Sequence, residues 1–175
     1  MTPQVRAKKA AKAMFAADKA SSSLGMEIIA IAPGAATLTM RVRDGMLNGH
    51  RICHGGYIFT LADSAFAFAC NSYNKLTLAQ QNQITYIAPG KAGELLTATA
   101  SETALSGRSG VYDVMVTGED GRIVATMRGL SRTINGHLFP EDGEDALKIL
   151  PPISAHLILS KLQAATRSKR SNWSG

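Results

Sequence analysis

The hydrophobic and polar positions divide this 175-residue chain into one unusually apolar segment and several alternating ones. The apolar segment covers residues 57–73 and carries hydrophobic side chains on several faces of a helix. Such a helix belongs in a core, because an amphipathic surface helix confines its apolar residues to one stripe. His54-Gly55-Gly56 comes directly before it and predicts the start of the helix.

Alternation with a period of two predicts strands on both sides of this helix. The clearest strand is 36–43, in which Leu38, Met40 and Val42 share one face. Pro33-Gly34 is a turn dipeptide, so it joins this strand to the one before it as a hairpin. The predicted strands are 26–32, 36–43, 77–87, 95–104, 110–117 and 123–134.

About six strands with short links favour antiparallel pairing in one sheet. A sheet curled around the apolar helix buries one side of it, which predicts an α+β fold with an antiparallel sheet wrapped around a central helix. The other side of the helix and the sheet edges still need cover, and a second copy of the chain is the simplest source. We therefore expect a homo-oligomer.

The predicted helices and strands divide the chain into three regions. Residues 1–24 form an N-terminal part with an alanine-rich helix over 3–19, ended by the serines at 21–23 and by Gly25. Residues 25–135 form the domain of sheet and central helix. Residues 136–175 form a C-terminal extension that is partly disordered or helical, with a candidate helix at 155–166.

Composition and charge narrow the class of protein. A chain with 45% hydrophobic and 18% charged residues is typical of a globular domain. No apolar run reaches the roughly 18 residues that span a membrane, and no export segment follows the first basic residues. We therefore expect a cytoplasmic protein without a membrane partner, in which Cys53 and Cys70 are free thiols. The net charge of +6 gathers at the two chain ends, as in solvated termini, so we expect no nucleic-acid partner.

Asp63 is the first candidate for chemistry, because it lies in the middle of the apolar helix. Burying an unpaired carboxylate is costly, and carboxylates in apolar surroundings are enriched at functional sites. The alternative is a structural aspartate bonded to nearby backbone groups or to a hydroxyl such as that of Thr60 or Ser64.

The helix start offers a second element. Glycines at 55 and 56 leave backbone N–H groups open at the positive end of the helix dipole, which suits an anion or a developing oxyanion. Asn48 carries an amide that can donate to a carbonyl, although Asn48-Gly49 is also an ordinary turn. His50, Cys53 and His54 lack a fourth ligand, so we expect no metal.

These residues together resemble the signature of hotdog-fold thioesterases. Asn48, six further positions, Gly55-Gly56 and then Asp63 have that family's spacing. More narrowly, the segments 46–56, 69–72 and 110–114 are similar to the phenylacetate-pathway thioesterases called PaaI, over about residues 15–134.

The resemblance implies a hotdog fold and hydrolysis of acyl-CoA thioesters such as phenylacetyl-CoA or its hydroxy derivative. It also implies a homo-oligomer, for which we expect a homotetramer built as a dimer of dimers, with a simple dimer as the alternative. In that family one chain supplies the glycines and the asparagine, and its partner supplies the helix aspartate. Gly55 N–H then polarises the thioester carbonyl near Asn48 and His54, and Asp63 activates water or attacks the carbonyl itself. No cofactor is implied, since coenzyme A is part of the substrate. The alternative is a module or sensor that binds acyl-CoA without cleaving it.

The same resemblance implies contacts for the coenzyme. Arg108 is the expected phosphate ligand and Lys91 a weaker one, both of which are otherwise ordinary loop charges. The backbone or hydroxyl groups expected beside them are those of Gly56, Ser109 and Gly110. One departure from the family concerns a hydroxyl on the strand after the central helix, because the matching residue here is Ala79. Either Gln80 or Gln81 substitutes for it, or Asp63 works without such help.

Overall fold

The structure, a computed structural model, describes residues 1–141. The predicted extension beyond residue 141, with its candidate helix at 155–166, therefore lies outside the described residues. In chain order the elements are α1 (Pro3–Ala17), α2 (Lys19–Ser23), β1 (Glu27–Ala32), β2 (Ala35–Arg41), the short 3-10 helix η1 (Asp44–Met46), α3 (Gly55–Cys70), β3 (Thr77–Tyr86), β4 (Leu95–Ser106), β5 (Ser109–Thr117) and β6 (Ile123–Thr133).

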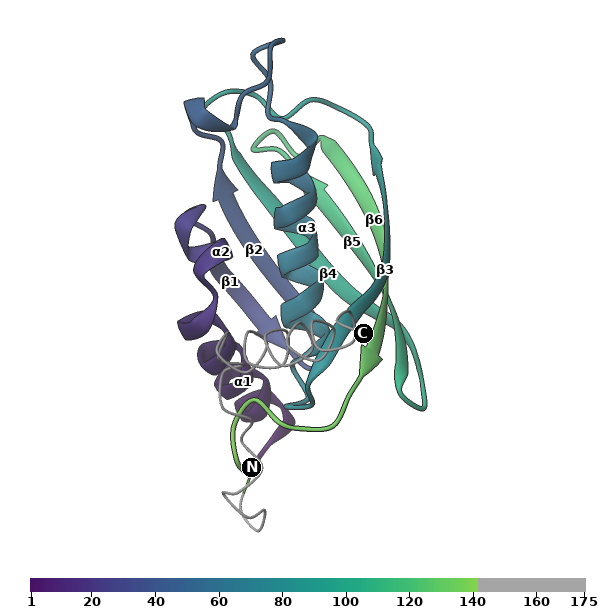
Figure 1. Cartoon of the computed structure of the whole chain (residues 1–175). Helices are drawn as coiled ribbons and strands as arrows, with labels where there is room; N and C mark the ends of the chain where they lie inside the picture. Colours follow the sequence, from purple (N-terminus) through teal and green to yellow (C-terminus); the bar gives the residue numbers. More distant parts are fainter. Residues whose placement is uncertain (142–175) are drawn as a thin grey trace, which may run out of the picture.

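The six strands form one antiparallel sheet in the order β1-β2-β4-β5-β6-β3. The sheet curves around α3, which lies along one of its faces, while α1 and α2 lie beside β1 (Figure 1). The predicted antiparallel sheet around a central helix is thus confirmed. Within residues 1–141, no helix is both long and apolar enough to cross a membrane.

The core forms where α3 meets the sheet. Leu61, Ala65 and Phe66 are fully buried, and the Phe66 ring meets the Tyr112 ring of β5 edge-on, with 5.5 Å between the ring centroids. Burying one large apolar side chain contributes about 1.5–3 kcal/mol, so this face of α3 anchors the helix on the sheet. Residues on the opposite side of the helix, Asp63 among them, are less buried.

The N-terminal helix ends earlier than the sequence predicts. α1 stops at Ala17, because the Asp18 carboxylate accepts a hydrogen bond from the Ser21 N–H at 3.0 Å and starts a second helix. The serines at 21–23 therefore form α2 and do not end a helix over 3–19. The Ser21 and Ser64 hydroxyls are 2.9 Å apart, which joins α2 to α3.

Two irregularities fix the sheet near α3. Gly34 has φ +71°, the left-handed conformation that a tight turn between β1 and β2 requires, so the predicted Pro33-Gly34 hairpin is confirmed. In β3 the pairing with β6 shifts between Ala79 and Gln81, as in a β-bulge. A bulge adds one residue to one strand and so changes which later side chains face the helix.

Candidate active site

The first turn of α3 has one open backbone donor. The His54 side chain caps the helix, since its Nδ1 accepts a hydrogen bond from the Gly56 N–H at 3.0 Å. The Tyr57 N–H donates to the His54 carbonyl at 2.9 Å. The Gly55 N–H has no acceptor within residues 1–141, and it lies at the positive end of the helix dipole. This N–H is therefore placed to bind an anion or an oxyanion.

Tyr86, at the end of β3, contacts Gly55. Its hydroxyl donates to the Gly55 carbonyl at 2.9 Å, and a Cβ at position 55 would lie 3.0 Å from the tyrosine ring. Glycine at this position therefore lets the ring approach the backbone. No sequence pattern singles out Tyr86, because an aromatic residue at a strand end is ordinary.

Asn48 organises the loop before α3. Its Oδ1 accepts hydrogen bonds from the His50 N–H at 2.9 Å and from the Ile52 N–H at 3.4 Å, as in an Asx turn. The His54 N–H donates to the Met46 carbonyl, so the same loop fixes the residue that caps the helix. The Asn48 Nδ2 has no partner in the described chain. Its proposed contact with a substrate carbonyl, like the catalytic role of His54, stays a prediction.

Asp63 is half-buried on α3, and Asn82 of β3 is its hydrogen-bond partner. The Asn82 Nδ2 donates to Asp63 Oδ1 at 2.5 Å. The hydroxyls named as alternatives are engaged elsewhere, since Thr60 donates to the Gly56 carbonyl and Ser64 pairs with Ser21. Burial raises the pKa of the Asp63 carboxyl, and the hydrogen bond from Asn82 lowers it by less. The site thus holds a desolvated carboxylate with one specific donor.

Sequence reasoning missed Asn82 because of the β3 bulge. Counting by twos from Ala79, whose partner is the buried Ser131, would place Asn82 on the outer face of the sheet. The extra residue reverses this parity and turns Asn82 toward α3, opposite Gly129 of β6. The available signal was Gly129, since a glycine inside a strand indicates a bulge or a close approach. Gln80 and Gln81, the expected substitutes for the missing hydroxyl, are exposed and make no hydrogen bond to Asp63 in the described chain.

The residues expected to contact coenzyme A are spread over both ends of the sheet. Arg108 donates from Nε to the Thr133 carbonyl, and Lys91 pairs with Asp120 at 3.3 Å. Between them runs β4, whose 12 residues span roughly 35 Å. Within one chain, Arg108 and Lys91 are therefore too far apart to hold the same phosphate.

The remaining coenzyme candidates have structural contacts of their own. The Gly56 N–H is occupied by His54, and the Ser109 hydroxyl accepts a hydrogen bond from Arg132 at 3.3 Å. Gly110 is buried, and a Cβ there would lie 2.7 Å from the Ser131 hydroxyl. Their coenzyme contacts stay predictions.

Thiol chemistry is disfavoured by the surroundings of both cysteines. Cys53 and Cys70 are buried and free, and burial raises the pKa of their thiols to about 11 and about 12. The thiolate, which is the nucleophilic form, is therefore scarce at neutral pH. Among residues 1–141, no group of three or more His, Cys, Asp and Glu side chains is arranged to hold a metal ion.

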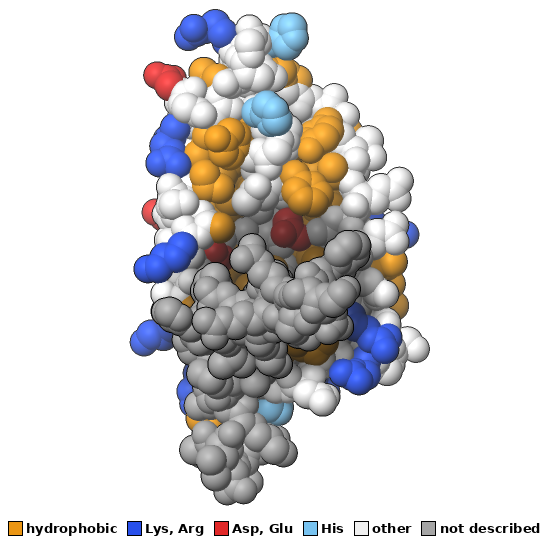
Figure 2. All heavy atoms as spheres, viewed as in Figure 1, with side chains coloured by type: hydrophobic (Ala, Val, Ile, Leu, Met, Phe, Trp, Pro, Cys, Tyr) orange, Lys and Arg blue, Asp and Glu red, His pale blue; other side chains and the backbone are white. Residues whose placement is uncertain are grey.

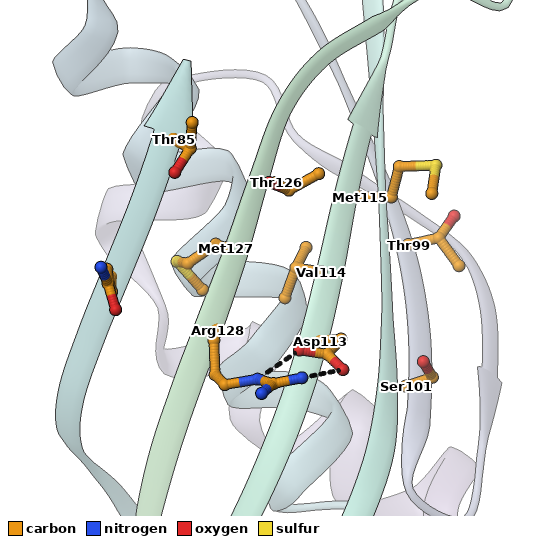
Figure 3. A pocket seen from close by; sticks show the side chains of 10 residues that line it. Thr85, Thr99, Ser101, Asp113, Val114, Met115, Thr126, Met127 and Arg128 are labelled. Carbon is orange, nitrogen blue, oxygen red and sulfur yellow. Dashed lines mark hydrogen bonds and ion pairs between the residues drawn. The ribbon is translucent and has the colours of Figure 1, made fainter. Parts of the chain in front are cut away.

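The two faces of the sheet differ in chemistry. On the α3 side, hydrophobic side chains gather on both sides of the helix, with histidine near the end where α3 begins (Figure 2). On the opposite face a groove of about 740 Å³ is lined by hydroxyl side chains such as Thr99 and Ser101, by apolar side chains such as Met115, and by the Asp113–Arg128 ion pair at 2.8 Å (Figure 3). Asp63 and Gly55 do not line this groove, so the candidate active site belongs to the α3 side.

The chain is similar in sequence to known thioesterases. The family model described as the thioesterase superfamily matches residues 50–125, the segment that contains Gly55, Asp63 and Asn82. The acyl-coenzyme A thioesterase PaaI of Escherichia coli (strain K12) is 43% identical over 131 residues, which cover 75% of this chain and 94% of the relative. The chain belongs to the PaaI family of hotdog thioesterases.

Solved structures of the family have the same fold. The structure of E. coli PaaI, from the phenylacetic acid degradation operon, superposes with a TM-score of 0.77 at 41% identity, covering 78% of this chain and 99% of that one. The structure of smu.793 from Streptococcus mutans UA159, bound to acetyl CoA, gives a TM-score of 0.62 at 27% identity over 64% of this chain and 90% of that one. The hotdog architecture predicted from the sequence is confirmed for this PaaI-family chain.

Proposed function

We propose that this PaaI-family protein hydrolyses acyl-CoA thioesters to a free acid and coenzyme A, with phenylacetyl or hydroxyphenylacetyl groups as preferred substrates. One observation carries the proposal: the same helix bears an open N–H at Gly55 and a desolvated carboxylate at Asp63. An oxyanion donor and one carboxylate suffice for a thioester, whose thiolate leaves readily. The acyl-CoA substrate also fits the name of the E. coli relative and the acetyl CoA bound to smu.793.

The spacing of the two groups favours a site shared between two chains. Gly55 and Asp63 are eight residues apart on α3, or about 12 Å along the helix axis. A donor and a base must each lie about 3 Å from the reacting atoms, so one chain's pair cannot serve the same carbonyl. In the proposed site Gly55 belongs to one chain and Asp63 to its partner.

The free edge of β3 is the proposed contact between the chains. β3 ends the sheet, and Leu78, Tyr86 and Ile87 along it are each at least half exposed. Pairing through this edge around a two-fold axis covers those side chains and runs the two β3 strands antiparallel. It also brings the Lys91 end of one chain toward the Arg108 end of the other, where both can meet the coenzyme phosphates. Two such dimers form the proposed tetramer.

The proposed reaction begins when the thioester carbonyl oxygen accepts a hydrogen bond from the Gly55 N–H, with the Asn48 amide nearby. Either Asp63 takes a proton from water as the water oxygen attacks the carbonyl carbon, or the carboxylate attacks that carbon itself. Collapse of the oxyanion expels the coenzyme A thiolate. The first route gives the acid directly, and the second gives a mixed anhydride that water then hydrolyses. The half-buried rings of Tyr57 and Phe59 on α3 are the proposed contacts for an aromatic acyl group.

The test measures release of free thiol from a panel of aromatic and aliphatic acyl-CoAs. Asp63→Asn and Asp63→Ala are expected to lower kcat at least about 100-fold, the usual contribution of a general base. A wild-type rate in both variants would remove Asp63 from the mechanism. Binding of acyl-CoA without thiol release in the wild type would favour the sensor.

The shared site has a separate test by complementation. An Asp63→Asn chain and a Gly55→Val chain are each inactive alone, but their mixed dimer holds one intact site. After unfolding and refolding together, activity should recover to about a quarter of wild type, because half of the random dimers are mixed and each has one of two sites intact. No recovery, with mixed dimers verified by mass, would place both groups in one chain's site.

A further inference from the structure

We propose that Asn82 is a positioning residue that clamps Oδ1 of Asp63 and leaves Oδ2 as the oxygen that meets the water or the thioester carbon. The role rests on the proposed thioesterase function. In this role Asn82 takes the place of the strand hydroxyl of other hotdog thioesterases, for which this chain has Ala79.

The two carboxylate oxygens of Asp63 have different surroundings. Oδ1 accepts the hydrogen bond from Asn82 Nδ2 at 2.5 Å. Oδ2 has no hydrogen-bond partner within residues 1–141, yet it is not among the enclosed polar atoms, so it reaches the surface of the helix. A single donor to one oxygen fixes the rotation of the carboxylate and selects the oxygen that remains reactive.

The backbone is shaped to admit this amide. Asn82 pairs with Gly129 on β6, and a Cβ at position 129 would lie 2.9 Å from Asn82 Oδ1 and 2.9 Å from the Phe66 ring. Glycine at 129 therefore leaves the space in which the amide lies under α3. The bulge in β3 and the glycine in β6 act together, because one turns Asn82 toward the helix and the other makes room for it.

The orientation of the amide leaves its own oxygen without a partner. Asn82 Oδ1 is buried and is the one enclosed side-chain polar atom in residues 1–141 without a hydrogen bond. Buried acceptors are nearly always bonded, and an orphan one destabilises the fold. Turning the amide over would place its oxygen against the Asp63 carboxylate. The unbonded oxygen thus follows from directing the N–H groups at Asp63.

The clamp also favours the charged form of Asp63. Burial opposes ionisation of this carboxyl and the Asn82 hydrogen bond supports it. The titratable group whose electrostatic interaction with Asp63 is resolved in residues 1–141 is Cys70, on the same helix, and its thiol stays uncharged at neutral pH with a pKa of about 12. Loss of Asn82 should therefore shift the ionisation of Asp63 to higher pH.

The decisive variant is Asn82→Leu, which has the same number and branching of side-chain heavy atoms but no hydrogen-bond donor. Its kcat should fall roughly 10- to 100-fold, the value of a hydrogen bond to a charged group, with KM changed less than about twofold. The acidic limb of its kcat profile should move to higher pH. Gly129→Ala should act in the same direction by displacing the amide. Gln83→Leu, on the opposite face of β3, is the matched control and should keep the wild-type profile.

A readout without catalysis separates this role from the thioesterase function. In protein labelled with ¹³C at the aspartate carboxyl carbon, the Asp63 signal is assigned by its loss in Asp63→Asn, and its titration should move to higher pH in Asn82→Leu. That shift supports the clamp even if the wild type cleaves no CoA ester. An unchanged titration, or a wild-type kcat and acidic limb in Asn82→Leu, overturns it.

Discussion

The His54 imidazole accepts a hydrogen bond from the Gly56 N–H at 3.0 Å, and this contact leaves Gly55 as the open donor in the first three residues of α3. A histidine that sequence motifs place among catalytic residues thus has a structural task next to the proposed oxyanion donor. The cap orders the turn on which that donor lies. His54 is therefore expected to affect stability directly and catalysis through Gly55.

His54→Ala should lower the free energy of unfolding by about 1 kcal/mol, the usual cost of losing an N-cap side chain. Urea unfolding measures this, with His50→Ala as a control, because the His50 side chain is exposed in the preceding loop. kcat should fall much less than in Asp63→Asn. A variant of unchanged stability that is as inactive as Asp63→Asn would make His54 a catalytic residue.

Gly55→Ala tests the close approach of Tyr86. The new Cβ would lie 3.0 Å from the ring, so the ring or the helix start must move and the Gly55 N–H loses its position. We expect kcat to fall about 100-fold, as when one oxyanion donor is lost. Gly45→Ala is the control, since a Cβ there has no neighbour within 4 Å. Equal activity of the two alanine variants would show that the donor position tolerates the shift.

Glu94 is expected to stabilise the connection between β3 and β4, residues 87–94, which supports the loop before α3. Its carboxylate, in a residue only 6% exposed, accepts hydrogen bonds from both terminal nitrogens of Arg122, at 2.6 and 2.7 Å, and from the Lys91 N–H. The Gly90 carbonyl in the same connection accepts from the Cys53 N–H. Glu94→Gln should cost about 2 kcal/mol, the value of hydrogen bonds to a charged group, because Arg122 loses the Glu94 carboxylate but keeps its ion pair with Asp120 at 2.7 Å. Asp113→Asn breaks an exposed bidentate pair with Arg128 and should cost little.

The difference in the free energy of unfolding between the wild type and Glu94→Gln should depend on pH. The hydrogen bonds from Arg122 lower the pKa of Glu94 in the folded protein, so its contribution is present above the ordinary glutamate pKa of about 4.3. It is lost as the pH falls through the lower, folded pKa. Unfolding of the wild type and Glu94→Gln between pH 3 and 7 should converge at the acidic end, and a constant difference would contradict this assignment.

Asp63 should have the opposite effect on stability. Because burial raises its folded pKa, the folded state holds the proton more tightly, and stability falls as the pH rises through the window between the unfolded and folded pKa values. Asp63→Asn should therefore be more stable than the wild type by about 1 kcal/mol at pH 8, as is common when a strained catalytic group is removed. The gain should vanish below about pH 4, where both side chains are neutral. Thermal unfolding at the two pH values measures it.

The parts of this fold that were predictable are those fixed by local pattern. Burial of α3 follows from an apolar run that covers several faces of a helix, β2 from alternation with a period of two, and the Pro33-Gly34 hairpin from turn chemistry. The split of the N-terminal helix at Asp18 depended on a side-chain cap, and the inward turn of Asn82 depended on a bulge. A single residue breaks the local pattern in each case, Asp18 by capping a new helix and the extra residue of β3 by shifting its pairing, and periodicity does not detect such a break. Motif spacing located Asp63 and Gly55, but their hydrogen-bond partners, Asn82 and Tyr86, come from a strand distant in sequence.

The eight-residue spacing of Gly55 and Asp63 has a kinetic corollary. If each reaction centre needs both groups from different polypeptides, an isolated polypeptide carries two half-sites and no working one. The turnover rate per chain then depends on the fraction of chains that are assembled. It should decline when the protein is diluted below the dissociation constant of the assembly. Protein abundance would then set not only how much enzyme is present but also what fraction of it is competent.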